Sequence, residues 1–368
     1  MTSTRAPLTQ KIFITDCEGP ISKNDNAFEL ASHFIPNGDR LFTIISRYDD
    51  ILADIVKREG YKAGDTLKLI LPFLKAYGVT NQKITDFSSQ NLILMPGANE
   101  MLKFVRGFMP SYIVSTSYEQ YMRALCAAIE FPFENVRCTH VDLDSYSAVS
   151  HERAKIKRLA ETIVKPPMLK IPKDARSLTD LPEEMQTVVH RLDEIFWKGI
   201  SNMKVGRMLH EVNPIGGSEK AAAVKDIVAG LNGQLENVMY VGDSITDVQA
   251  FQFVRNAGGL AVSFNGNSYA VREAEVAVLA ENAVVTAALA SAFSRFGKAR
   301  LLVLAKEWEP ATLGKFSLQE TFAKSFLGLS RNRLPQVKPV TKQNLAKLMR
   351  QSTEFRKTVR GEAIGRLG

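Results

Sequence analysis

A short apolar run near the N-terminus predicts the first strand of the fold. Residues 11–15 (KIFIT) are mostly apolar and β-branched, and the polar sequence DCEGP (residues 16–20) follows them directly. An apolar run of this length that stops at glycine and proline is typical of a buried strand that enters a tight loop. The predicted strand therefore ends at a carboxylate, Asp16.

Helical spacing replaces this pattern between residue 28 and about residue 87. Apolar residues recur three and four positions apart, as in Leu67, Ile70, Leu71 and Leu74. Such spacing places apolar side chains on one face of a helix. We therefore predict a small helical module that follows the first strand.

Strands and helices alternate through most of the remaining chain. The expected helices cover residues 98–107, 118–129, 219–230 and 247–254, and the expected strands cover residues 112–115, 136–141, 238–241, 260–264 and 276–279. This alternation predicts an α/β fold in which right-handed crossovers join the strands of one parallel sheet. Residues 151–212 interrupt it with two charged helices and a stretch rich in proline and lysine.

Composition narrows the class of protein further. The chain has 368 residues, of which 45% are hydrophobic, but no apolar run reaches the roughly eighteen residues that a membrane helix needs. No secretory signal is visible at the start of the sequence. The three cysteines, Cys17, Cys126 and Cys138, have neither the number nor the spacing of a disulfide framework or a zinc site. We therefore expect a cytoplasmic protein with reduced thiols and no membrane partner.

Positive charge is concentrated at the C-terminal end. Residues 295–368 contain 16 lysines and arginines against 5 acidic residues, whereas residues 1–294 contain 31 against 34. Basic helical segments of this kind bind nucleic acid or acidic proteins in some cases, and in others they are solvated surface. The sequence leaves both interpretations open.

Polar side chains occur where the expected strands end. They are Asp16 and Glu18 after the first strand, Ser115 and Thr116 at the end of the second, Asp243 and Asp247 after the strand at 238–241, and Lys220 at the start of the helix before it. In an open parallel sheet, ligands bind outside these carboxyl ends. Four carboxylates repel one another unless a cation neutralises them, and oxygen ligands favour Mg²⁺. A cation, a lysine and a helix N-terminus together predict a phosphoryl site.

Four motifs in this order resemble those of the haloacid dehalogenase superfamily. They are ITDCEGP (14–20), YIVSTS (112–117), SEK (218–220) and YVGDSITD (240–247). The helical insert after the first motif and the sequence AGGLAVSFNGN (257–267) resemble the phosphoserine-phosphatase-like branch. The chain is also similar to an uncharacterised archaeal group of the superfamily.

The resemblance implies a specific domain organisation. A three-layer, Rossmann-like α/β core with a parallel sheet would comprise residues 1–20 and 97–294, with an additional helical insert at about 151–212. A helical cap would cover residues 21–96. A basic helical extension would follow at 295–368.

The resemblance also implies a Mg²⁺-dependent phosphatase that hydrolyses a small phosphomonoester through an aspartyl-phosphate. In that mechanism Asp16 is the nucleophile and a metal ligand. Glu18 is the general acid and base, and its backbone carbonyl binds the metal. Lys220 balances the charge of the nucleophile and of the phosphate.

The remaining motif residues are implied to bind the two ligands. Ser115 and Thr116 would bind the phosphoryl oxygens together with Lys220. Asp243 and Asp247 would hold Mg²⁺, directly or through water. The resemblance names neither the substrate nor the oligomeric state.

One residue departs from the superfamily pattern. Glu18 stands where the pattern has an aspartate, so its carboxyl group could overshoot the leaving oxygen by about 1 Å, and such a displacement can cost about 100-fold in rate. This departure keeps a second interpretation open, a non-catalytic accessory or regulatory subunit that docks a partner through its basic tail. A phosphotransferase or phosphomutase would use the same residues as a phosphatase.

Overall fold

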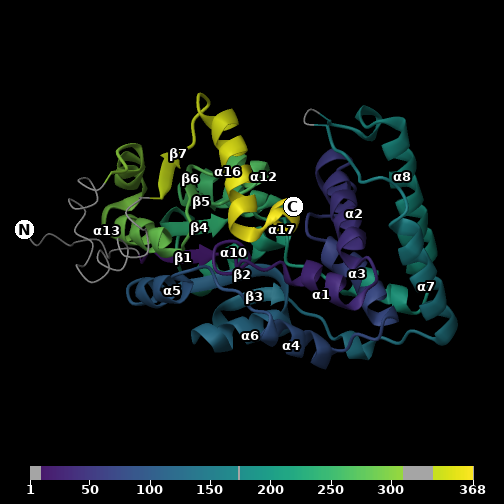
Figure 1. Ribbon diagram of the computed structural model, residues 1–368. Coiled ribbons are helices and arrows are strands. Elements are labelled where there is room, and N and C mark those ends of the chain that lie inside the picture. The colour runs from purple at the N-terminus through teal and green to yellow at the C-terminus, as the bar shows by residue number, and fades with distance from the viewer. Residues whose placement is uncertain (1–9, 173–174, 310–334, 368) are drawn as a thin grey trace, which may run out of the picture. The chain divides into compact units, whose positions relative to one another are not determined.

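The computed structural model describes residues 10–172, 175–309 and 335–367 (Figure 1). These residues form two compact units. Within the described residues, the first unit contains 10–23, 93–114, 220–309 and 335–365, and the second contains 24–92, 115–172, 175–219 and 366–367. The C-terminal extension expected at 295–368 lies partly outside the described residues, at 310–334 and 368.

A seven-stranded sheet has the order β3-β2-β1-β4-β5-β6-β7. Its strands are β1 (Ile12–Thr15), β2 (Ser111–Tyr118), β3 (Val136–Thr139), β4 (Val238–Gly242), β5 (Leu260–Phe264), β6 (Val276–Leu279) and β7 (Gln336–Pro339). β1 pairs in parallel with both β2 and β4, and the β4–β5 and β5–β6 pairs are also parallel. The predicted α/β fold class is confirmed, although β2 is longer at both ends than the expected strand at 112–115.

The helices of the first unit flank this sheet. They are α5 (Ala98–Arg106), α10 (Ser218–Gly230), α11 (Val248–Asn256), α12 (Ser268–Glu273), α13 (Val284–Lys306), α16 (Leu345–Arg360) and α17 (Glu362–Gly365). α11 packs on β4 and β5, and α5 packs on α13. Every residue of β1, β4, β5 and β6 is buried, as expected for apolar strands in the centre of an α/β core.

The described part of the C-terminal segment contains a strand in addition to helices. Its strand β7 pairs antiparallel with β6, and α16 packs against α12 and β6 (Figure 1). Leu348 of α16 joins Val271 and Ala277 in an apolar cluster. Residues 335–365 therefore belong to the first unit, because a few apolar residues in an otherwise basic segment attach it to the edge of the sheet.

The second unit is mainly helical. Its helices are α1 (Asn26–Phe34), α2 (Gly38–Asp50), α3 (Thr66–Ala76), α4 (Asn81–Gln90), α6 (Glu119–Ile129), α7 (Ser150–Ile163), α8 (Glu183–Asp193) and α9 (Met208–Glu211). Side-chain contacts join the expected cap to the expected second insert. The Tyr48 hydroxyl donates to Asp193 at 2.5 Å, and Arg40 Nε donates to the Val164 carbonyl at 2.7 Å. Both inserts therefore contribute to one helical body.

None of the described helices has both the length and the apolar character needed to cross a membrane.

Candidate active site

Two neighbouring parallel strands bring three carboxylates together. Thr15, the last residue of β1, is in register with Val241 of β4, and the Asp16 N–H donates to the Val241 carbonyl at 2.8 Å. Asp16 and Asp243 therefore leave adjacent strands at the same edge of the sheet. Carboxylate oxygens of Asp16, Asp243 and Asp247 lie within 4.8 Å of one another, and all three residues are buried.

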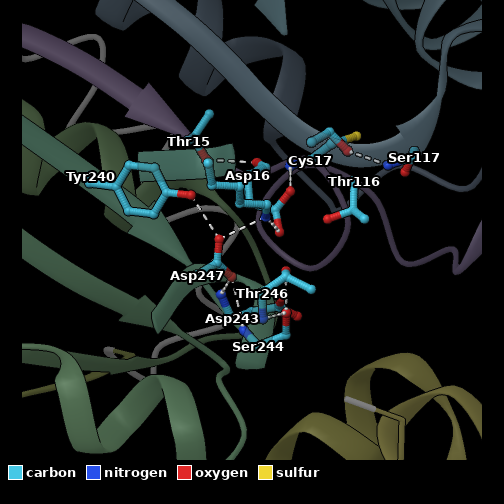
Figure 2. Close-up of polar contacts among 12 residues, drawn as sticks. Thr15, Asp16, Cys17, Thr116, Ser117, Tyr240, Asp243, Ser244, Thr246 and Asp247 are labelled. Carbon is cyan, nitrogen blue, oxygen red and sulfur yellow. Dashed lines mark hydrogen bonds and ion pairs between the residues drawn. The ribbon is translucent and has the colours of Figure 1, made fainter. Parts of the chain in front are cut away.

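The position of Asp247 is fixed through both of its oxygens (Figure 2). Its Oδ2 accepts the backbone N–H groups of Asp243 at 2.9 Å and Ser244 at 3.0 Å, which closes the turn after β4. Its Oδ1 accepts the Tyr240 hydroxyl at 2.8 Å and the Lys220 ammonium at 2.8 Å. A carboxylate with this many charge-assisted donors is held in one orientation.

Lys220, near the start of α10, connects two of the acids. Its fully buried Nζ lies 2.7 Å from Asp16 Oδ2 and 2.8 Å from Asp247 Oδ1. Burial lowers the pKa of Lys220, but the carboxylates of Asp16 and Asp247 outweigh this effect and raise it above its usual range. Burial raises the pKa of Asp16 to about 7, and the nearby Asp247 and Asp243 add to that rise while Lys220 opposes it.

The loop after β1 packs tightly against Asp243. The Cys17 N–H donates to Asp16 Oδ1 at 2.7 Å. Gly19 has a φ of 105°, and a Cβ there would lie 2.2 Å from Asp243 Oδ2, so only glycine fits. Glu18 lies half-buried in this loop and is not part of the three-carboxylate group. Its expected roles as acid, base and carbonyl ligand stay predictions.

Two arginines at this site were not predicted from the sequence. Arg356 donates to the carboxylate of Asp243, and Arg360 Nη1 donates to the same oxygen, Oδ2, at 3.1 Å. Both belong to α16, and both side chains are only 3% exposed. The available signal was the spacing of Ser352, Arg356 and Arg360 on one helix face, but the tail has many other basic residues.

The expected phosphate-binding residues lie in the second unit, where β2 continues beyond Val114. Ser115 Oγ accepts the Ser117 N–H at 3.2 Å. The buried Thr116 Oγ1 and Ser117 Oγ have no hydrogen-bond partner within the described part of the chain. Buried hydroxyls are usually hydrogen-bonded, so these two can serve a ligand. Thr116 was among the predicted residues and Ser117 was not.

Comparison with known proteins shows a family similarity for part of the chain. The family model for haloacid dehalogenase-like hydrolases matches residues 139–290, which include Lys220, Asp243 and Asp247. The matched part of the chain is therefore similar to haloacid dehalogenase-like hydrolases, in agreement with the resemblance predicted from the four motifs.

Solved structures also resemble this protein. A gene product of Archaeoglobus fulgidus, AF1437, is 27% identical with a TM-score of 0.78, and the match covers 98% of this chain and 99% of that one. This agrees with the predicted similarity to an archaeal group. A phosphoserine phosphatase in apo form is 12% identical with a TM-score of 0.44, over 74% of this chain and 95% of that one. Among curated proteins, none matches the sequence.

The acidic group formed by Asp16, Asp243 and Asp247 fits a magnesium ion. Its three carboxylates offer hard oxygen donors within 4.8 Å of one another. The raised pKa of Asp16 has burial as its main cause, and the other two acids add to it despite the contact with Lys220. A cation at this position would relieve that repulsion. Asp16, Asp243 and Asp247 are therefore the residues that would hold Mg²⁺.

Proposed function

We propose that this protein is a Mg²⁺-dependent phosphatase that hydrolyses a small phosphomonoester through an aspartyl-phosphate. The observation that carries the proposal is the buried chain of ion pairs from Asp16 through Lys220 to Asp247. It lies where β1 and β4 end, which is the usual ligand position in a parallel sheet. Haloacid dehalogenase-like proteins are hydrolases, which agrees with this chemistry.

Asp16 is the proposed nucleophile. Its carboxylate would attack phosphorus, so that an oxygen–phosphorus bond forms while the bond from phosphorus to the ester oxygen breaks. Lys220, 2.7 Å from Asp16 Oδ2, would stabilise the negative charge shared between the nucleophile and the phosphoryl group. When bound, Mg²⁺ would supply further positive charge to the phosphoryl oxygens and favour the ionised form of Asp16.

Glu18 is the proposed acid and base, two residues beyond the nucleophile. It would protonate the leaving ester oxygen in the first step. In the second step it would take a proton from the water that attacks phosphorus, which releases inorganic phosphate and regenerates Asp16. The hydroxyls of Ser115, Thr116 and Ser117 are the proposed donors to the phosphoryl oxygens.

The test is release of inorganic phosphate from a panel of phosphomonoesters, with and without Mg²⁺. We expect Mg²⁺-dependent release by the wild type and at least a thousandfold loss in Asp16→Asn, because the amide is a poor nucleophile. Asp226→Asn changes an exposed acid of α10 and is the matched control. Release by Asp16→Asn at the wild-type rate would contradict the assignment.

Three further outcomes test the role of Glu18 and separate the alternative functions. Higher activity in Glu18→Asp would show that the additional methylene limits the rate. Phosphoryl transfer to an added alcohol in place of water would identify a phosphotransferase. A folded protein that binds Mg²⁺ but acts on no member of the panel would favour the accessory-subunit interpretation.

A further inference from the structure

The C-terminal arm, which we define as residues 335–365, reaches the proposed metal site. Arg356 donates to the Asp243 carboxylate and, at 3.3 Å, to the Asp243 backbone carbonyl. Arg360 donates to the same carboxylate oxygen at 3.1 Å. Asp243 is only 2% exposed, so two guanidinium groups and one carboxylate meet out of contact with bulk water.

Other contacts also hold the arm in place, including the pairing of β7 with β6 and the Val340 N–H, which donates to the Glu275 carbonyl at 2.8 Å. Ser352 Oγ donates to the Gly266 carbonyl at 2.6 Å, and Arg360 Nε donates to the Lys23 carbonyl at 3.1 Å. The apolar contact centres on Leu348, and β7 is an edge strand of four residues. The remaining face of α16 is mostly polar. Among the contacts that dock this helix, the ion pairs with Asp243 are the ones that involve a proposed metal ligand.

Three basic side chains pair with the three acids of this cluster in the described residues. Asp16, Asp243 and Asp247 carry at most three negative charges, and the cations of Lys220, Arg356 and Arg360 offset them. A divalent cation held by Asp243 would face both guanidinium groups across a short, buried distance. Repulsion between buried like charges is strong because solvent screens it little.

We propose that the C-terminal arm is an electrostatic competitor of the metal: Arg356 and Arg360 compete with a divalent cation for Asp243, so that cation binding weakens the docking of α16. The inference rests on the metal site of the proposed function. Coupling between two binding events is reciprocal, so the docked arm lowers the affinity for the cation by the same factor. Docking of the arm thereby controls how readily the site binds a metal ion.

Metal binding provides the first test, with Mn²⁺ as a paramagnetic probe whose free form is counted by electron paramagnetic resonance. We expect the double variant Arg356→Gln/Arg360→Gln to bind Mn²⁺ roughly tenfold more tightly than the wild type, because two opposing charges are removed. The control, Lys347→Gln/Arg350→Gln, removes two exposed charges from the same helix and should bind like the wild type. Equal or weaker binding by the Arg356/Arg360 variant would overturn the inference.

Hydrogen exchange of the wild-type protein gives a second test that needs no variant to fold. Amide exchange in α16 should become faster when Mg²⁺ is added, whereas exchange in α11 should not. Unchanged or slower exchange in α16 would refute the competition.

The two proposals fail in different ways. Equal Mn²⁺ affinities together with Mg²⁺-dependent phosphate release would reject the arm's role alone. Competition for Mn²⁺ without phosphate release would reject only the phosphatase. No Mn²⁺ binding by any of the three proteins would reject both proposals.

Discussion

The two units of this protein both bury aspartates, but they stabilise them differently. In the second unit, Asp49 accepts the Tyr61 hydroxyl at 2.6 Å and the Gly64 N–H at 2.9 Å. Asp65 pairs there with Lys62 and Lys68, each three residues away in the sequence. In the first unit, acids from different elements share cations that are distant in sequence.

This difference shows which buried acids form a site. The partners of Asp65 are three residues away, and those of Asp49 are 12 and 15 residues away, so each carboxylate is stabilised by a nearby stretch of the chain. Asp16, Asp243 and Asp247 instead form the only group in the described residues in which three acids lie close enough to hold one metal ion. Convergence of acids from separate strands, rather than burial, therefore indicates function.

The largest predicted effect concerns the shared cation. Lys220→Met leaves Asp16 and Asp247 without their buried partner and should lower the free energy of unfolding by about 3–5 kcal/mol. Lys68→Met should cost less, because Asp65 keeps Lys62 at 3.2 Å. Urea unfolding of both variants measures the difference.

Lys225→Met is the control for this comparison, since Lys225 is exposed on the same helix as Lys220. Equal losses of stability in the Lys220 and Lys68 variants would contradict the comparison. They would show that Asp16 and Asp247 depend on Lys220 no more than Asp65 depends on Lys68.

A smaller effect is expected from pH. Burial raises the pKa of Asp49 from 3.8 to about 7 and that of Asp50 from 3.8 to about 6. At a pH between the ordinary pKa and the raised pKa, each carboxyl group is protonated in the folded protein and ionised in the unfolded chain. These two groups therefore make the folded protein less stable as the pH rises from about 4 to 7. The slope is at most about 1.4 kcal/mol per pH unit for each carboxyl group.

Urea unfolding at pH 5 and pH 7 tests this linkage. Asp49→Asn should reduce the loss of stability between the two pH values, because the amide mimics the protonated acid. Asp86→Asn, exposed on α4, should leave it unchanged. A wild-type protein that becomes more stable across this interval, with the same change in Asp49→Asn, would contradict the assignment.

The parts of the site that follow directly from the strand pattern and from the order of the motifs could be predicted from the sequence. Asp16 and Asp243 each follow an apolar run that predicts a strand. In α/β folds, ligands generally bind at the edge of the sheet where parallel strands end, so both acids could be assigned to that edge. The motif order then identified Lys220 and Asp247. Their meeting in the structure follows from the register of β1 and β4.

The arginines could not be predicted in this way. Arg356 lies 113 residues after Asp243 in the sequence, and Arg360 lies 117 residues after it. Basic residues on a polar helix are typical of solvated surface, so their pattern does not indicate burial. The strand β7 was missed for a related reason, because only Val337 of its four residues is buried and pairing with β6 stabilises it.

The proposed function depends on Asp16 as the nucleophile of a metal-dependent phosphoryl site. The most direct measurement is acid quenching of the wild-type protein during turnover of p-nitrophenyl phosphate with Mg²⁺, followed by peptide mass spectrometry. We expect one added phosphoryl group on the peptide that contains Asp16, absent without Mg²⁺ and absent in Asp16→Asn. Turnover with the phosphoryl group on another residue would contradict it.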